Sequence, residues 1–136
     1  MFHKYQHIER LGTDEVEGID DGIVYLFPKI DGTNGQVSYE NGELCCGSRN
    51  RKLTLDNDNQ GFMQYILNHK ETYLPFFEKY PNAILYGEFL VKHTISWYRQ
   101  DAYRKFYVFD VVEKFENDEP IYMHYEDYRP ILADLG

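Results

Sequence analysis

The chain has 136 residues, a formal net charge of -9 at pH 7 and 43% hydrophobic residues, enough for one domain with a sizeable core. The acidic balance excludes a protein that coats nucleic acid non-specifically, because such affinity comes from neutralising phosphates with lysine and arginine. No apolar run approaches membrane-spanning length and the N-terminus lacks the apolar stretch of a secretory signal. We therefore expect a soluble, cytoplasmic protein with no membrane partner.

The hydrophobic patterns and turn residues predict a series of strands and helices. Residues 3–11 predict a short helix or turn, the acidic residues 14–21 a loop, and the apolar run 22–29 a strand. Two strands, 36–39 and 43–47, flank Asn41-Gly42, a dipeptide typical of tight hairpins. A helix over 61–69, capped by Asp58 or Asn59, precedes a second over 74–80, in whose first turn Pro75 is tolerated.

Two apolar runs in the second half each contain one carboxylate. Residues 84–91 hold Glu88 and residues 106–112 hold Asp110, and both runs predict buried strands. The loop 93–104 between them interleaves aromatic and basic side chains, which suits a nucleic-acid contact surface and equally a packed loop. A short strand over 121–123 and a helix over 125–135 follow. The sequence thus predicts an α+β fold with mostly antiparallel sheets and flanking helices.

Lys29 is the candidate nucleophile. It ends the predicted strand 22–29 and begins the stretch Lys29-Ile30-Asp31-Gly32-Thr33-Asn34, whose turn-forming residues let a backbone approach a ligand closely. A nucleophilic lysine needs desolvation or a neighbouring cation to lose its proton, and we expect Phe27, Pro28 and Ile30 to supply the desolvation. An exposed lysine before an ordinary Asp-Gly turn fits these residues as well.

Glu88 and the basic residues are the other candidates. A carboxylate inside an apolar strand is costly unless it is paired, so Glu88 either bonds a lysine or a backbone amide structurally, or accepts a ligand hydroxyl or holds a metal. Because Gly87 beside it would leave room for a ligand, we interpret Glu88 as functional. Arg49, Arg51 and Lys52 form one basic cluster. A second consists of Lys92, Arg99, Arg104 and Lys105. A fold that brings the clusters beside Lys29 would make a phosphate site, whereas a solvated surface of mixed charge is the alternative for each cluster alone.

Four motifs in order resemble those of the covalent nucleotidyltransferases, the superfamily of ATP-dependent polynucleotide ligases and capping enzymes, and most closely its RNA ligase branch. The first motif is the stretch from Lys29 to Asn34, and the next is Ser48-Arg49-Asn50. The third is Tyr86-Gly87-Glu88, and the fourth is the run 106–110, which ends in Phe109-Asp110. The resemblance covers nearly the whole chain and implies an adenylylation domain of ATP-grasp-like type.

The resemblance also implies the roles of these residues. Lys29 would become covalently adenylylated by ATP, Arg49 would meet phosphate, Glu88 would contact the ribose and Phe109 would stack on adenine. Asp31, Gly32 and Asn34 would bind the nucleotide, and Asp110 would be a metal ligand for Mg²⁺. Further candidates for phosphate or RNA contacts are Arg51, Lys52 and Arg99. The AMP would pass to an RNA 5′-phosphate, and a 3′-hydroxyl would then displace it and seal the strands.

The chain departs from the family pattern at its end. The family has two further motifs downstream, a metal-binding glutamate and a pair of lysines, and residues 1–136 contain neither. We expect this chain to be the N-terminal portion of a longer nucleotidyltransferase domain, with weak or no activity alone. A noncatalytic nucleotide-binding or RNA-binding module with the same pocket is the alternative, and a capping-type enzyme that uses GTP is a third.

Overall fold

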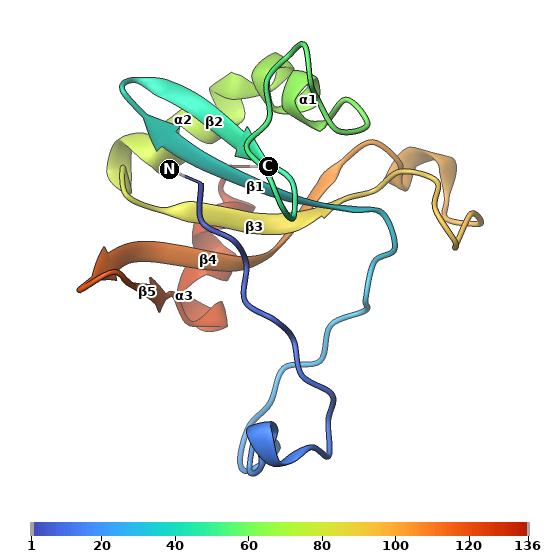
Figure 1. Cartoon of the computed structure of the whole chain (residues 1–136), viewed down its shortest axis with the longest axis vertical. Coiled ribbons are helices and arrows are strands. Elements are labelled where there is room, and N and C mark those ends of the chain that lie inside the picture. The colour runs from blue at the N-terminus through green and yellow to red at the C-terminus, as the bar shows by residue number, and fades with distance from the viewer. Residues whose placement is uncertain (1, 136) are drawn as a thin grey trace.

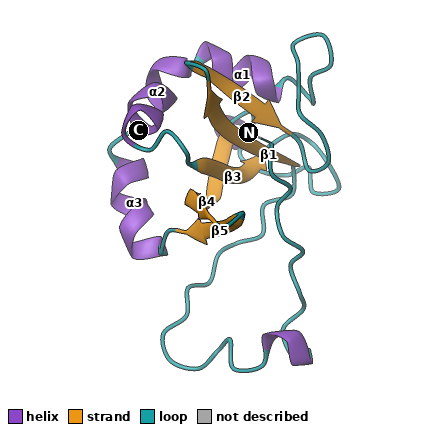
Figure 2. Ribbon diagram, turned by 60° about the vertical axis from the view of Figure 1, so that its left-hand side comes forward, coloured by secondary structure: helices purple, strands orange, loops and turns teal. Residues whose placement is uncertain are grey.

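The computed structural model describes residues 2–135, and its centre is one five-stranded antiparallel sheet (Figure 1). The strand order is β2-β1-β3-β4-β5. The strands are β1 (Thr33–Glu40), β2 (Glu43–Gly47), β3 (Ile84–Phe89), β4 (Phe106–Glu116) and β5 (Glu119–Tyr122). Helices α1 (Phe62–Asn68), α2 (Lys70–Lys79) and α3 (Tyr125–Ala133) pack on one side of it (Figure 2). The predicted α+β class is confirmed.

Alternation along the strands divides the sheet into two faces. Val37, Leu85 and Val111 point toward the helices and form the core with residues such as Phe62 of α1 and Tyr128 of α3. The alternate positions on β3 belong to the other face, which we call the helix-free face; its strand residues include Ile84, Tyr86 and Glu88. The helix-free face therefore displays the carboxylate that the sequence singles out.

The N-terminal segment lies on this helix-free face instead of forming the predicted helix over 3–11. The His3 amide donates to Oε1 of Gln36 at 3.2 Å, and Nε2 of Gln36 donates back to the His3 carbonyl at 3.0 Å. The Tyr86 hydroxyl also donates to the His3 carbonyl, at 2.7 Å. Residues 3–10 form neither the predicted helix nor a turn, because the sheet satisfies these backbone groups directly.

Residues 7–29 form an arm that projects from the body and returns to it (Figure 1). Its regular structure is one 3₁₀ turn, Asp14–Val16. The strand predicted over 22–29 is wrong: Ile23 and Leu26 are 88% and 92% exposed, and the run pairs with no strand among residues 2–135. Apolar composition alone does not make a strand without a partner to satisfy its backbone.

The local turn and cap signals give mixed outcomes. The Asn41-Gly42 hairpin is confirmed, with both residues at positive φ as a type I′ turn requires. Asp58 caps α1 in function, since its carboxylate accepts the amides of Met63 and Gln64, although Gly61 occupies the N-cap position. Pro75 lies inside α2 and not in its first turn, because that helix begins earlier, at Lys70.

No helix within the described chain has the length and apolarity needed to cross a membrane.

Candidate active site

The turn that follows Lys29 rests directly on strand β3. The amide of Gly32 donates a hydrogen bond to Oε1 of Glu88 at 3.1 Å. A Cβ at position 32 would lie 2.2 Å from the Phe89 carbonyl oxygen and 2.9 Å from Cα of Leu90. Only glycine fits this approach. The first and third motifs of the sequence are therefore brought together.

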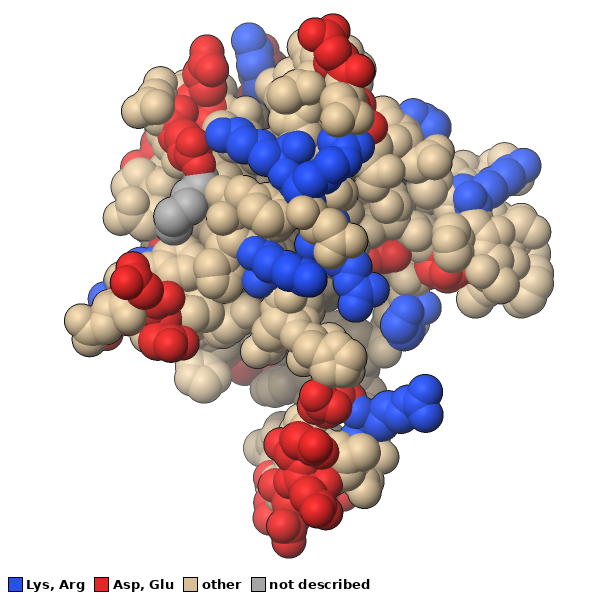
Figure 3. Space-filling model, in the orientation of Figure 1, with Lys and Arg blue, Asp and Glu red and all other residues tan. Residues whose placement is uncertain are grey.

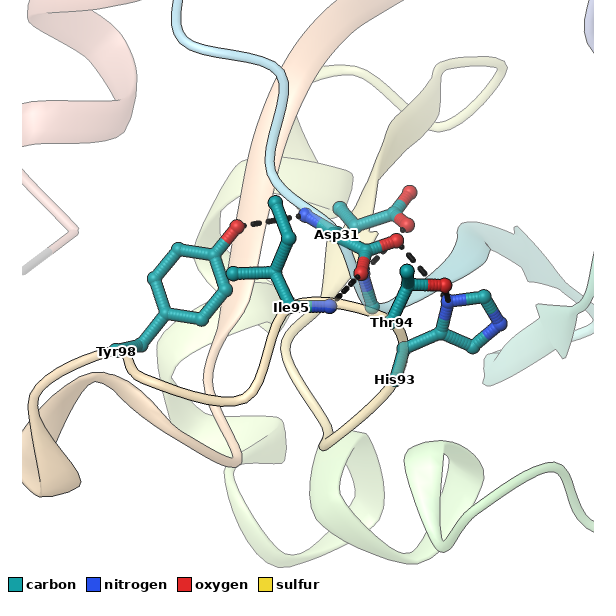
Figure 4. A network of polar contacts seen from close by, with 7 residues as sticks. Asp31, His93, Thr94, Ile95 and Tyr98 are labelled. Atoms are coloured by element: carbon teal, nitrogen blue, oxygen red, sulfur yellow. Dashed lines mark hydrogen bonds and ion pairs between the residues drawn. The ribbon is translucent and has the colours of Figure 1, made fainter.

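Asp31 fixes the other side of this turn to the loop 92–98 (Figure 4). Its Oδ2 accepts the Ile95 amide at 2.6 Å, and its Oδ1 lies 3.0 Å from Nδ1 of His93. Its own amide donates to the Tyr98 hydroxyl at 3.0 Å. The bond from Ile95 is the main cause that lowers the Asp31 pKa, and the charges of His93 and Lys29 act in the same direction. Asp31 thus holds a loop in place with its carboxylate.

Glu88 and Asn34 lie opposite each other on β3 and β1. Burial raises the pKa of Glu88, while the Gly32 amide and the charge of Lys29 oppose that rise. The Oδ1 atom of Asn34 is buried and has no hydrogen-bond partner among residues 2–135. An unpaired buried acceptor is costly, and a hydrogen-bond donor on a ligand would satisfy it.

Lys29 is electrostatically coupled to both neighbouring carboxylates, Asp31 and Glu88. Its side chain is nevertheless exposed, and Phe27 before it is 52% exposed. The expectation that Phe27, Pro28 and Ile30 desolvate the amine is therefore wrong for this chain. The charged groups that act on Lys29 are anionic, so they do not supply the neighbouring cation that is the alternative route to activating a lysine.

Strand β4 contributes Phe109 and Asp110 beside Tyr86. Asp110 pairs in register with Tyr86, and a bulge at Phe109 interrupts the pairing with β3. Tyr5 of the N-terminal segment covers both: its ring centroid is 5.3 Å from that of Phe109, and its hydroxyl donates to Oδ2 of Asp110 at 2.7 Å. The room expected beside Gly87 is filled, since a Cβ there would meet the Phe106 ring and the Tyr107 carbonyl.

The basic candidates differ in whether their side chains already form hydrogen bonds or ion pairs. Arg49 is exposed, follows the end of β2 and makes no hydrogen bond or ion pair within the described chain. Arg51 donates to the carbonyls of Asn57 at 2.6 Å and Asp58 at 3.1 Å, so it braces its own loop. Ion pairs occupy the other two, Lys52 with Glu40 at 3.3 Å and Arg99 with Asp101 at 2.6 Å. Arg49 is the member of this set that stays available to a phosphate.

Three residues around the site were not identified from the sequence. Tyr5, His93 and Tyr98 act through long-range contacts with Asp110 and Asp31. They carry no local signal, because tyrosine and histidine are common in loops and only the fold supplies their partners. The one hint was the aromatic content of the loop 93–104.

The described residues do not form a metal cage. No group of three or more His, Cys, Asp or Glu side chains comes together in residues 2–135, and Asp110 already accepts the Tyr5 hydroxyl. Mg²⁺ keeps several waters and is commonly bound by one or two carboxylates together with substrate phosphates.

Comparison with solved structures gives the same fold. An apo mutant of a Naegleria gruberi RNA ligase matches with a TM-score of 0.56 and 20% identity, over 79% of this chain and 30% of that one. An archaeal ATP-dependent RNA ligase matches with a TM-score of 0.56 and 21% identity, over 79% and 28%. A Naegleria gruberi RNA ligase mutant with ATP and Mn gives 0.55 and 19%, over 79% and 30%. The chain spans about 30% of the length of these structures.

Sequence comparison identifies the family. No curated protein sequence matches the chain. The RNA ligase family matches residues 22–136, which include Lys29, Arg49, Glu88 and Phe109. That range is far more than half of the sequence, and the chain therefore belongs to the RNA ligase family.

Proposed function

We propose that this chain is the N-terminal, nucleotide-binding portion of an ATP-dependent RNA ligase and that Lys29 is its nucleophile. The observation that carries the proposal is the bond from the Gly32 amide to Glu88, which holds the Lys29 turn against β3. The proposal is also supported by Glu88 and the unpaired Asn34 acceptor, which lie opposite each other on β3 and β1, and by the charge of Lys29, which acts on Glu88. These groups match the needs of a nucleotide: an attacking amine, an acceptor for ribose hydroxyls and an acceptor for amino groups.

The proposed chemistry begins at Nζ of Lys29. The deprotonated amine attacks the α-phosphorus of ATP, a nitrogen–phosphorus bond forms, and the bond to the bridging oxygen breaks to release pyrophosphate. An oxygen of the RNA 5′-phosphate then displaces Lys29 and takes the AMP. Finally a 3′-hydroxyl attacks that 5′-phosphorus and AMP leaves. Each step places negative charge on phosphoryl oxygens, which Arg49 is available to stabilise.

The exposure of Lys29 leads us to expect little adenylylation activity from residues 1–136 alone. Because the described chain neither buries the amine nor couples it to a cation, we expect ATP binding with little covalent labelling. The remaining activation would come from segments of a longer protein, in keeping with the 30% coverage of the matched structures.

The test is incubation with α-labelled ATP and Mg²⁺, followed by denaturing electrophoresis, beside a direct measurement of ATP binding. Any label must disappear in Lys29→Ala and persist in Lys70→Ala, a change of an exposed lysine on helix α2. Label that survives in Lys29→Ala shows that the nucleophile is wrong. A chain that neither binds ATP nor becomes labelled contradicts the proposal altogether.

A noncatalytic nucleotide-binding module is the second candidate, and the exposed position of Lys29 favours it. Such a module binds ATP through Glu88 and Asn34 and forms no covalent product, even within the full-length protein. Competition between ATP and GTP distinguishes both candidates from a capping-type enzyme, which would prefer GTP.

A further inference from the structure

A cleft of about 340 Å³ lies at the base of the loop that joins β3 to β4. It is lined by Gln60, Val91, Lys92, Gln100, Tyr103 and Arg104. None of these residues belongs to the four motifs of the sequence. The lining contains two cations, two amides and no carboxylate, although the chain as a whole has a net charge of -9.

The cationic groups of this cleft are available to an anion. Nη2 of Arg104 donates to the Gln60 carbonyl at 3.1 Å, and its guanidinium lies 5.7 Å from the Phe89 ring centroid. Those contacts orient the guanidinium and leave most of its five donors unused. Neither Lys92 nor Arg104 forms an ion pair with any residue from 2 to 135. The hydroxyl of Tyr103 is buried and likewise has no partner in that range.

The backbone of the cleft is strained at two of its lining residues. Gln60 and Arg104 have φ values of 56° and 58°, in the left-handed region. The other non-glycine residues with positive φ, Asn41, Asn117 and Asp118, are Asn or Asp in hairpin turns, where this conformation is common. Such strain persists where the surrounding structure imposes it and is concentrated at functional sites. The same two residues are joined by the hydrogen bond from Nη2 of Arg104 to the Gln60 carbonyl.

The cleft borders the turn of the candidate nucleophile. The Arg104 amide donates to the Leu90 carbonyl at 2.7 Å. A Cβ on Gly32 would approach Cα of the same Leu90 to 2.9 Å. The backbone of Leu90 thus separates the cleft from Gly32, three residues after Lys29.

We propose that this cleft binds a backbone phosphate of the single-stranded RNA whose end is brought to Lys29. The proposal rests on the RNA ligase function above, and it assigns Lys92 and Arg104 to the RNA and not to ATP. Phosphate contacts of this kind position a strand without reading its sequence. The number of such contacts sets the slope of log affinity against log salt concentration.

The test measures binding of a fluorescently labelled, 5′-phosphorylated oligoribonucleotide by anisotropy over a range of salt concentrations. Lys92→Gln should weaken binding about tenfold and reduce the slope of log affinity against log salt by about 0.7, the value for one contact to a single strand. Lys70→Gln makes the same charge change on helix α2 and should leave both values unchanged. Arg104→Gln should act like Lys92→Gln, and Arg104→Lys should restore most of the slope.

The outcomes separate this proposal from the proposed function. A slope and affinity unchanged in Lys92→Gln and Arg104→Gln would overturn the cleft assignment, whatever the labelling assay gives. A loss of ATP affinity with RNA binding intact would overturn it too, since the cleft would then hold the nucleotide phosphates. Conversely, RNA binding that depends on both residues supports the cleft even if Lys29 is never labelled. Because Lys92 is exposed, the urea midpoint of Lys92→Gln should equal that of the wild type.

Discussion

The hydroxyl of Tyr5 donates a hydrogen bond to Oδ2 of Asp110 at 2.7 Å and ties the N-terminal segment across the helix-free face of the sheet. Burial raises the pKa of both groups, Tyr5 and Asp110, and their bond lowers that of Asp110 again. The contact joins residues 105 positions apart and covers Phe109, the residue expected to stack on adenine.

We expect Tyr5→Phe to lower the free energy of unfolding by about 1 to 3 kcal/mol, because it leaves a half-buried carboxylate without its donor. Urea denaturation of Tyr5→Phe, Asp110→Asn and the double variant measures the coupling between the two residues. Tyr122→Phe, on β5, is the matched control, since its hydroxyl forms no hydrogen bond within residues 2–135. A coupling energy near zero would show that the bond does not anchor the segment.

The carboxylate of Glu88 should lower the free energy of unfolding at neutral pH and raise the affinity for ATP. Since burial raises its pKa, the folded state favours the protonated form, and the cost of ionisation is present above the folded pKa. We expect Glu88→Gln to be at least as stable as the wild type at neutral pH, with a difference that vanishes as the pH falls below about 4.3. ATP affinity should nevertheless fall about tenfold, because one of the two acceptor oxygens is replaced by an amide donor while the other still accepts the Gly32 amide.

Urea denaturation at several pH values and an ATP titration check this prediction. Glu43→Gln, an exposed change on β2, controls for the removal of one charge. The contrary result would be a Glu88→Gln variant that is less stable than the wild type at neutral pH and closer to it at low pH. That result would show that the Gly32 bond, and not burial, dominates the energetics of Glu88.

A feature of the fold or of the site can be predicted from the sequence when the residues that determine it are close together in the chain. The Asn41-Gly42 hairpin and the runs around Glu88 and Asp110 carry their own turn or periodicity signals, and all three are confirmed as strands or hairpins. The run 22–29 looks like a strand but has no partner in the described chain, and pairing is a non-local property. Similarly, the motifs placed Asp31 at the site, whereas its bonds to Ile95 and His93 depend on a loop more than 60 residues away.

The carboxylate of Asp31 should control the order of the loop that contains Trp97. This is the only tryptophan in the sequence and it is 80% exposed, so its fluorescence reports on the loop alone. We expect Asp31→Asn to lower the steady-state anisotropy of Trp97, because the bonds to Ile95 and His93 are weakened.

The pH dependence of that anisotropy has a definite sign. The pKa of Asp31 is lowered in the folded state, so its contribution is present above the unfolded value of about 3.9 and is lost as the pH falls through the folded pKa. Wild-type anisotropy should therefore drop in acid, while that of Asp31→Asn should stay constant. Equal acid profiles for the two proteins would mean that another group orders the loop. Ser96→Ala, in the same loop, is the control for a neutral substitution.

Arg49 and Arg51 are two residues apart, but we expect their substitution to have different effects, on ATP binding for Arg49 and on stability for Arg51. Arg51 donates to two backbone carbonyls of its own loop, so Arg51→Ala should lower the free energy of unfolding by about 1 to 3 kcal/mol. Arg49 is exposed and makes no such bond within the described chain, so Arg49→Ala should leave stability unchanged and lower ATP affinity or labelling about tenfold or more. Urea denaturation and an ATP titration on both variants test the pair. If Arg49→Ala unfolds as early as Arg51→Ala, or binds ATP as tightly as the wild type, the assignment of Arg49 to phosphate is wrong.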